Sequence, residues 1–108
     1  MSDHELLELA AKAAGIRYDA EKSLPVEGRK WWGLWLSFVD EPGEFARRHW
    51  NPLTDDGDAL RLAVAANQLN ILHLLDLYGD PVLYKADPTA ATRRAIVRAA
   101  AEIGKAMQ

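Results

Sequence analysis

The sequence predicts an α+β fold: a small, mainly antiparallel sheet with helices on both of its faces, which is a helix–sheet–helix (ABA) sandwich. Three observations support this prediction. Apolar residues recur with a helical period after residue 2, the run 31–39 is apolar on both strand faces, and a further helical pattern follows residue 87. A chain of 108 residues is expected to fold as a single domain, 1–108, with about three helices.

The first expected helix begins at a capping box. Ser2 and Glu5 are three residues apart, so each side chain can bind the backbone N–H of the other residue. Gly15 stands where a left-handed C-cap ends a helix, and Ile16 can fold back onto the last turn. The apolar face expected between these ends consists of Leu6, Leu9, Ala10 and Ala13.

A central strand is expected after a polar loop over 17–30. Alternate side chains of a strand point to opposite faces, and in 31–39 both faces are apolar, which predicts a strand covered by helical layers on both sides. Turn residues at 40–43 end this strand, and 44–50 is expected to form a short helical turn followed by an extended Trp50. One face would carry Trp32, Leu34, Leu36 and Phe38, and the other Trp31, Trp35 and Val39.

A second helix is expected after Asn51-Pro52, which forces an extended or turn conformation. Thr54 or Asp55 would cap this helix, and the acidic side chains of its first turn favour the helix dipole. Asn67 is the expected end. The buried stripe is expected to consist of Leu60, Ala63 and Val64.

Two strands are expected next. The run 69–78 alternates in the manner of a strand, with His73 as a hydrogen-bonded interior residue on an apolar face. The turn residues 79–81 connect it to a shorter strand over 82–86. A helix over 68–77 is the alternative, because leucine and histidine are not strong strand formers.

The last expected helix begins at Asp87-Pro88, an N-cap followed by proline at the first helical position. Residues 88–108 carry four basic side chains and one acidic one on a chain of net charge −3. Such asymmetry can mark a partner surface, but we expect the arginines to pair with acidic loops of the same chain. The small residues that would press against the sheet are Ala91, Ala95, Ile96, Ala99 and Ile103.

Composition excludes several classes of function. The chain has no cysteine, which excludes disulfides, thiolate metal sites and cysteine catalysis. The net charge of −3 argues against a general polyanion binder. No apolar run approaches the roughly 18 residues of a membrane span, and residues 1–5 lack the basic region of a signal peptide. We therefore expect a cytoplasmic protein that does not bind membranes.

Three segments carry a resemblance to a known family. The run 50–64, the closing helix over 91–107 and the opening residues 3–10 resemble small hypothetical proteins encoded by tailed phages and prophages, in particular the phage ABA sandwich domain family. The resemblance implies helix–sheet–helix layers and no established activity. Residues 17–49 depart from the family, so an activity peculiar to this chain is expected there.

An acidic cluster at the start of the second helix is one candidate site. Its carboxylates suit a hard cation such as Ca²⁺ or Mg²⁺, but the later glutamate of a calcium loop is missing and helix capping explains the cluster. We therefore expect no metal and a structural role for the motif that contains it, which comprises Trp50, Asn51, Pro52, Asp55, Asp56 and Asp58.

Basic and aromatic residues alternate on either side of the central strand and form a second candidate site. Tryptophan and arginine side chains suit bases and phosphates, so a single-stranded nucleic acid or a nucleotide is a conceivable ligand. The alternative, which we prefer at this point, is that the tryptophans belong to the core. The candidate binding residues are Arg29, Lys30, Trp31, Trp35, Arg47 and Arg48, with Arg93, Arg94 and Arg98 on the last helix.

The sequence contains no motif that indicates catalysis. His4, His49 and His73 show no metal-ligand spacing, and there is neither a nucleophile elbow nor a phosphate-binding glycine loop. The leading hypothesis is a non-enzymatic phage accessory protein without a cofactor. It would bind a host or phage protein in the bacterial cytoplasm. It could also form a homodimer. Nucleic-acid binding by the tryptophan- and arginine-rich surface is the alternative hypothesis.

Overall fold

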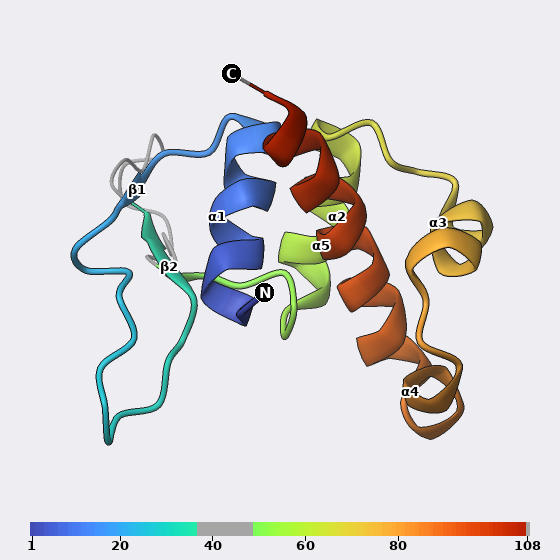
Figure 1. The fold of residues 1–108 in the computed structure, drawn as a ribbon, viewed down its shortest axis with the longest axis horizontal. Coiled ribbons are helices and arrows are strands. Elements are labelled where there is room, and N and C mark those ends of the chain that lie inside the picture. Colours follow the sequence, from blue (N-terminus) through green and yellow to red (C-terminus); the bar gives the residue numbers. More distant parts are fainter. Residues whose placement is uncertain (37–48, 108) are drawn as a thin grey trace.

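The structure, a computed structural model, describes residues 1–36 and 49–107 (Figure 1). These residues form five helices and a three-stranded antiparallel sheet, which confirms the mixed α+β class. The helices are α1 (Asp3–Ala14), α2 (Asp56–Ala65), α3 (Ile71–Tyr78), α4 (Pro81–Ala86) and α5 (Pro88–Ala106). The strands are β1 (Tyr18–Asp19), β2 (Leu34–Leu36) and β3 (His49–Trp50).

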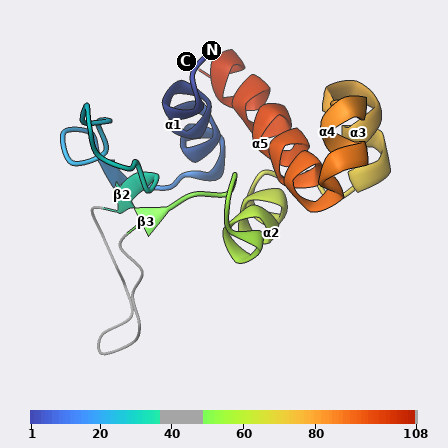
Figure 2. The same cartoon turned by 90° about the horizontal axis from the view of Figure 1, so that it is seen from below.

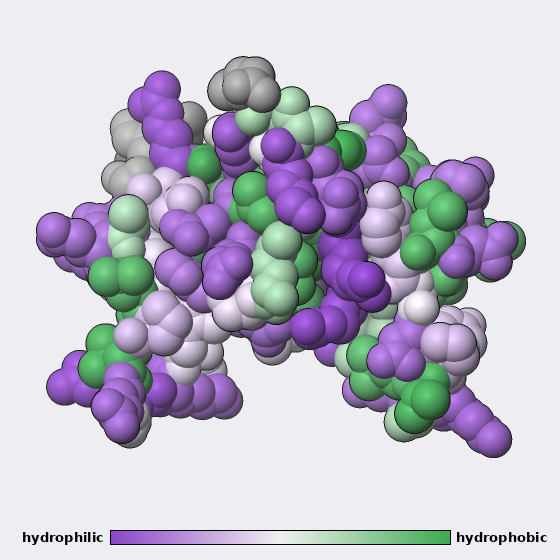
Figure 3. Space-filling view, viewed as in Figure 1, coloured by the Kyte–Doolittle hydropathy of each residue, from purple (hydrophilic) through white to green (hydrophobic). Residues whose placement is uncertain are grey.

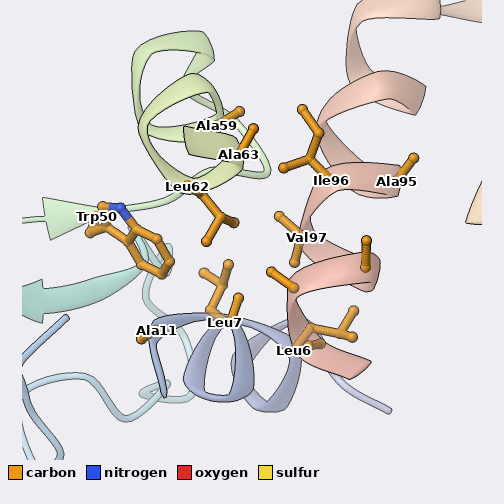
Figure 4. Packing of buried hydrophobic residues seen from close by; sticks show 14 of the residues in the cluster. Leu6, Leu7, Ala11, Trp50, Ala59, Leu62, Ala63, Ala95, Ile96 and Val97 are labelled. Atoms are coloured by element: carbon orange, nitrogen blue, oxygen red, sulfur yellow. The ribbon is translucent and has the colours of Figure 1, made fainter. Parts of the chain in front are cut away.

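The core lies where α1, α2 and α5 converge (Figure 4). Leu7, Leu62 and Val97, one from each helix, are fully buried there. The alanines of α5 are buried as predicted, but they pack mainly on α1 and not on the sheet. The reason is the close approach that small residues allow between helices: a Cβ added to Gly104 would overlap the carbonyl oxygen of Leu9.

The ends of α1 are as predicted. The hydroxyl of Ser2 accepts a hydrogen bond from the N–H of Glu5 at 3.1 Å, and Gly15 has a φ of 70°. The N–H of Ile16 donates to the carbonyl of Ala11 at 2.9 Å, which completes the C-terminal cap. The fully buried face is slightly rotated from the expected one and consists of Leu6, Leu7, Ala10 and Ala11.

The sheet has the order β1-β2-β3, and its middle strand, β2, lies within the strand predicted over 31–39. Trp50 is extended in β3 and pairs with Leu34. The five described helices lie on one side of these strands (Figure 1 and Figure 2), and the expected helices on both faces are not seen in the described residues. Residues 31–33 of the expected strand are described and do not belong to β2, so this part of the predicted strand is wrong. Residues 37–39 of that strand, the turn at 40–43 and the helical turn at 44–48 lie outside the described residues.

The two strands predicted over 69–78 and 82–86 are wrong, because these residues form α3 and α4. Side chains cap both helices: Asn70 accepts from the N–H of His73 at 3.3 Å, and Asp80 accepts from the N–H of Val82 at 3.0 Å. Once α3 is helical, Leu74 is buried and His73 is exposed instead of interior. Residues 69–86 therefore add no strand to the sheet, and the described residues contain five helices instead of about three.

The predicted buried face of α2 is also partly wrong. Asp55 caps the helix and Asn67, with a φ of 57°, ends it as expected. Leu60 and Val64, however, are 63% and 59% exposed. The helix is rotated because the carboxylate of Asp58 is buried and accepts the N–H of Asn51 at 3.0 Å. The inward side chains are therefore Asp58, Ala59, Leu62 and Ala63.

Candidate functional site

An open groove of about 650 Å³ lies between the 22–33 segment and the strands β2 and β3, and we call it the tryptophan groove. No carboxylate of the described residues lines this groove. Its apolar wall includes Leu24 and Val26. The cationic and aromatic side chains that line it are Lys22, Arg29, Lys30, Trp31, Trp32, Trp35 and His49.

Ser23 holds the loop against the sheet. Its side chain is fully buried, and its hydroxyl accepts the N–H of Trp35 at 2.8 Å while donating to the carbonyl of Asp19. Its own carbonyl accepts the indole N–H of Trp31 at 2.8 Å. These bonds fix two tryptophans of the groove through one serine. The sequence showed only a serine in a polar loop, so this role was missed.

Two lysine ammonium groups form cation–π contacts with tryptophan rings in the groove. The ammonium of Lys30 lies 4.2 Å from the ring centroid of Trp32, and that of Lys22 lies 5.6 Å from the ring of Trp35. Trp35 also meets the ring of His49 edge-on, with the centroids 4.9 Å apart. Trp32 is 57% exposed, although it was expected on a strand face covered by helices. The groove thus presents an accessible indole with positive charge beside it.

A polar cluster lies behind the groove and joins it to α1. The ring of His4 contacts Trp31 edge-on, with a centroid distance of 5.7 Å, and its Nδ1 lies 3.7 Å from Glu8. The other oxygen of Glu8 accepts the hydroxyl of Tyr18 at 2.9 Å. Burial, together with this hydrogen bond to a carboxylate, raises the pKa of Tyr18 to about 12. The cluster anchors β1 and one wall of the groove to α1.

The structure brings four of the predicted binding residues together: Arg29, Lys30, Trp31 and Trp35. Arg47 and Arg48 lie outside the described residues. Lys22, Leu24 and Val26 also line the groove and were missed, because the polar loop in which they lie has no periodic pattern that would indicate a surface.

The acidic motif has structural partners. Asp55 accepts the N–H of Asp58 at 2.8 Å, and Asp58 also binds Arg61 at 2.8 Å. Asp56 pairs with Arg93 at 2.7 Å. Within residues 1–36 and 49–107 no group of three or more histidine, aspartate or glutamate side chains is arranged to hold a metal ion.

The three arginines of α5 bind within the chain, and two of them pair with acidic side chains as expected. Arg93 donates to the carbonyl of Leu53 at 2.8 Å in addition to its pair with Asp56. Arg94 binds Asp3 at 3.0 Å, and Arg98 donates to the carbonyl of Tyr78 at 3.0 Å. These arginines therefore do not extend the tryptophan groove.

The chain was compared with protein-family models, curated proteins and solved structures, and none of the three comparisons finds a match. Within the described part of the chain, no helix combines the length and the apolar character needed to cross a membrane.

Proposed function

We propose that this protein is a non-enzymatic binding protein and that the tryptophan groove binds single-stranded nucleic acid. One observation carries the proposal: three indoles and three cationic side chains line one open groove, and no carboxylate of the described residues lines it with them. Such a combination of stacking surfaces and positive charge is typical of proteins that bind single strands without sequence preference.

Trp32 is the stacking surface for a base. It is the most exposed of the described tryptophans that line the groove, and Lys30 already lies over its ring. A base can take the place of the ammonium on the indole face, and the displaced lysine then lies beside the phosphates. Stacking of one base on an aromatic side chain contributes about 1–3 kcal/mol.

The local charge of the groove differs from the charge of the whole chain. Lys22, Arg29 and Lys30 contribute three positive charges, whereas the net charge of the chain is −3. Long-range attraction of a polyanion is therefore weak, and binding depends on direct phosphate contacts. Three such contacts give a slope of about −2 for the logarithm of affinity against the logarithm of salt concentration.

Fluorescence anisotropy with a labelled oligothymidylate at low salt tests the proposal. The single strand is expected to bind more tightly than a duplex, because only unpaired bases can stack on Trp32. Trp32→Ala should weaken binding roughly 5- to 150-fold, and Lys30→Ala should reduce the salt slope by about 0.7. Lys105→Ala, on the exposed end of α5, is the matched control and should leave affinity unchanged.

Two results would overturn the proposal. One is the absence of single-strand binding at low salt by a wild-type protein with a normal circular dichroism spectrum. The other is an affinity that Trp32→Ala leaves unchanged, since the indole would then not contact the bases.

We also propose that the protein is a phage or prophage accessory protein with a host-takeover or anti-defence role in the cytoplasm of a bacterial host. This part of the proposal rests on the resemblance of residues 3–10, 50–64 and 91–107 to the phage ABA sandwich domain family. We further propose that the whole chain forms the helix–sheet–helix sandwich of that family.

Protein binding is the second candidate function, and a different surface favours it. α3 and α4 expose large apolar side chains at the end of the molecule opposite the tryptophan groove (Figure 1). Leu72 and Val82 are 79% and 80% exposed. Exposed apolar surface that gathers in one region is typical of a protein contact.

A further inference from the structure

α3 and α4 form a pair of short helices on the outer side of α5 (Figure 2). Leu74 is the buried residue of α3, and α4 has no fully buried residue. An open groove of about 450 Å³ lies between the two helices, and we call it the α3–α4 groove. The lining residues that matter here are Leu72, Leu75, Asp76, Asp80, Pro81 and Tyr84.

The α3–α4 groove is apolar with an acidic margin. Its lining contains two carboxylates and no cationic side chain among the described residues. Asp80 is engaged in capping α4, while Asp76 is exposed and has no ion pair within the described part of the chain. The nearby Arg98 donates to the carbonyl of Tyr78, at the end of α3. A complementary surface would therefore offer apolar side chains together with positive charge.

The chain itself carries such a surface. The loop over 24–32 projects from the other end of the molecule, and green patches mark both this loop and α4 in Figure 3. Leu24, Val26 and Trp32 of the loop are 54%, 56% and 57% exposed. Arg29 and Lys30 are exposed beside them, and Glu27 is the one acidic residue of the segment.

A β-turn shapes the tip of this loop. The N–H of Arg29 donates to the carbonyl of Val26 at 3.1 Å, and Gly28 has a φ of 82°. Ser23 and Trp31 hold the base of the loop through the hydrogen bond described above. The loop is thus an ordered projection with apolar and cationic side chains, and one copy of the chain cannot place it in its own α3–α4 groove.

We propose that the 24–32 loop of one copy docks in the α3–α4 groove of a second copy. Apolar side chains of the loop cover Leu72 and Tyr84, and Arg29 and Lys30 approach Asp76. The same face of a second copy is a poorer occupant, because it would oppose carboxylates with carboxylates. This contact goes beyond nucleic-acid binding. The α3–α4 groove shares no residue with the tryptophan groove, but the docking loop carries Arg29, Lys30 and Trp32, which line the tryptophan groove of its own copy.

Sedimentation velocity of the full chain at low salt, over a concentration series up to about 0.5 mM, tests the contact. The weight-average mass of the wild type should rise above 12.0 kDa with concentration and fall back as salt is added. Leu72→Arg places a cation in the groove, and Trp32→Ala removes the largest side chain of the loop. Both positions are exposed, so both variants should fold and each should stay monomeric.

Mixing the two variants identifies the contact. Leu72→Arg keeps an intact loop and Trp32→Ala keeps an intact groove, so the mixture should contain a heterodimer of about 24 kDa, twice 12.0 kDa. A wild type that stays monomeric throughout the series would overturn the proposal. So would association that persists in Leu72→Arg, or a mixture without heterodimer. Leu72→Arg should also retain nucleic-acid binding, which separates failure of this contact from failure of the proposed function.

Discussion

Gly104 of α5 lies against the backbone carbonyl of Leu9 in α1, and this contact sets how closely these two helices approach. A side chain at residue 104 has no room, because its Cβ would overlap the carbonyl oxygen. The alanines on the same face of α5 extend this close packing along α1. The small-residue stripe thus joins two helices.

Gly104→Ala is expected to lower the free energy of unfolding by about 2 kcal/mol. Alanine favours a helix by about 1 kcal/mol relative to glycine, but the overlap with Leu9 forces the helices apart. Urea denaturation followed by circular dichroism measures the change. Lys105→Ala, at the neighbouring exposed position, is the control and should change stability by less than about 0.5 kcal/mol. A stabilised Gly104→Ala variant would contradict the close contact.

Asp58→Ala is expected to lower the free energy of unfolding by about 2–3 kcal/mol. The substitution leaves the N–H of Asn51 buried without this acceptor and removes the nearer of two carboxylates that pair with Arg61. Asp56→Ala is the matched control in the same helical turn. Its carboxylate is 73% exposed, so loss of the pair with Arg93 should cost less than about 1 kcal/mol. Equal effects in urea denaturation would show that Asp58 does not orient α2.

Leu62 and Leu60 distinguish the two possible inward faces of α2. Leu62 is fully buried, so Leu62→Ala should lower the free energy of unfolding by about 3 kcal/mol. Leu60 is 63% exposed, and Leu60→Ala should change the free energy of unfolding by less than about 0.5 kcal/mol. Thermal or urea denaturation of the two variants compares them directly. A larger loss of stability in Leu60→Ala than in Leu62→Ala would contradict the observed face and support the one expected from the sequence.

Tyr18 should make stability fall in alkaline solution. In the unfolded chain this hydroxyl loses its proton near pH 10.0, whereas the folded protein retains it up to a pKa of about 12. Below pH 10 both states hold the proton and the contribution is complete. Between about pH 10 and 12 the unfolded state binds fewer protons, so the free energy of unfolding decreases as pH rises.

Tyr18→Phe isolates this effect from the titration of lysines. The variant has no hydroxyl that titrates at residue 18. Its free energy of unfolding should therefore depend less steeply on pH between 10 and 12 than that of the wild type. Urea denaturation at pH 9, 10, 11 and 12 measures both proteins. Parallel curves for the two would rule out the raised pKa of Tyr18.

The ends of α1 and α2 and the start of α5 were predictable from the sequence because capping is local. Ser2, Gly15, Asp55 and Asp87 satisfy backbone groups within a few residues of themselves, and each acts where its pattern indicated. The cationic and aromatic residues of the candidate site were also visible, because 29–35 places several of them close together in the chain. Ser23 and Lys22 were not, since their role depends on hydrogen bonds and contacts with β2.

Only the tertiary structure decided the state of 69–86 and the direction in which α2 and α5 face. A leucine-rich run satisfies both the strand and the helical period, and packing of α3 on α5 selects the helix. The rotation of α2 depends on a bond between Asp58 and Asn51, seven residues apart. For α1, α2 and the start of α5, the sequence determined the helix ends through short-range hydrogen bonds. Which side chains became buried, and which were left exposed to bind a ligand, depended on contacts between distant segments.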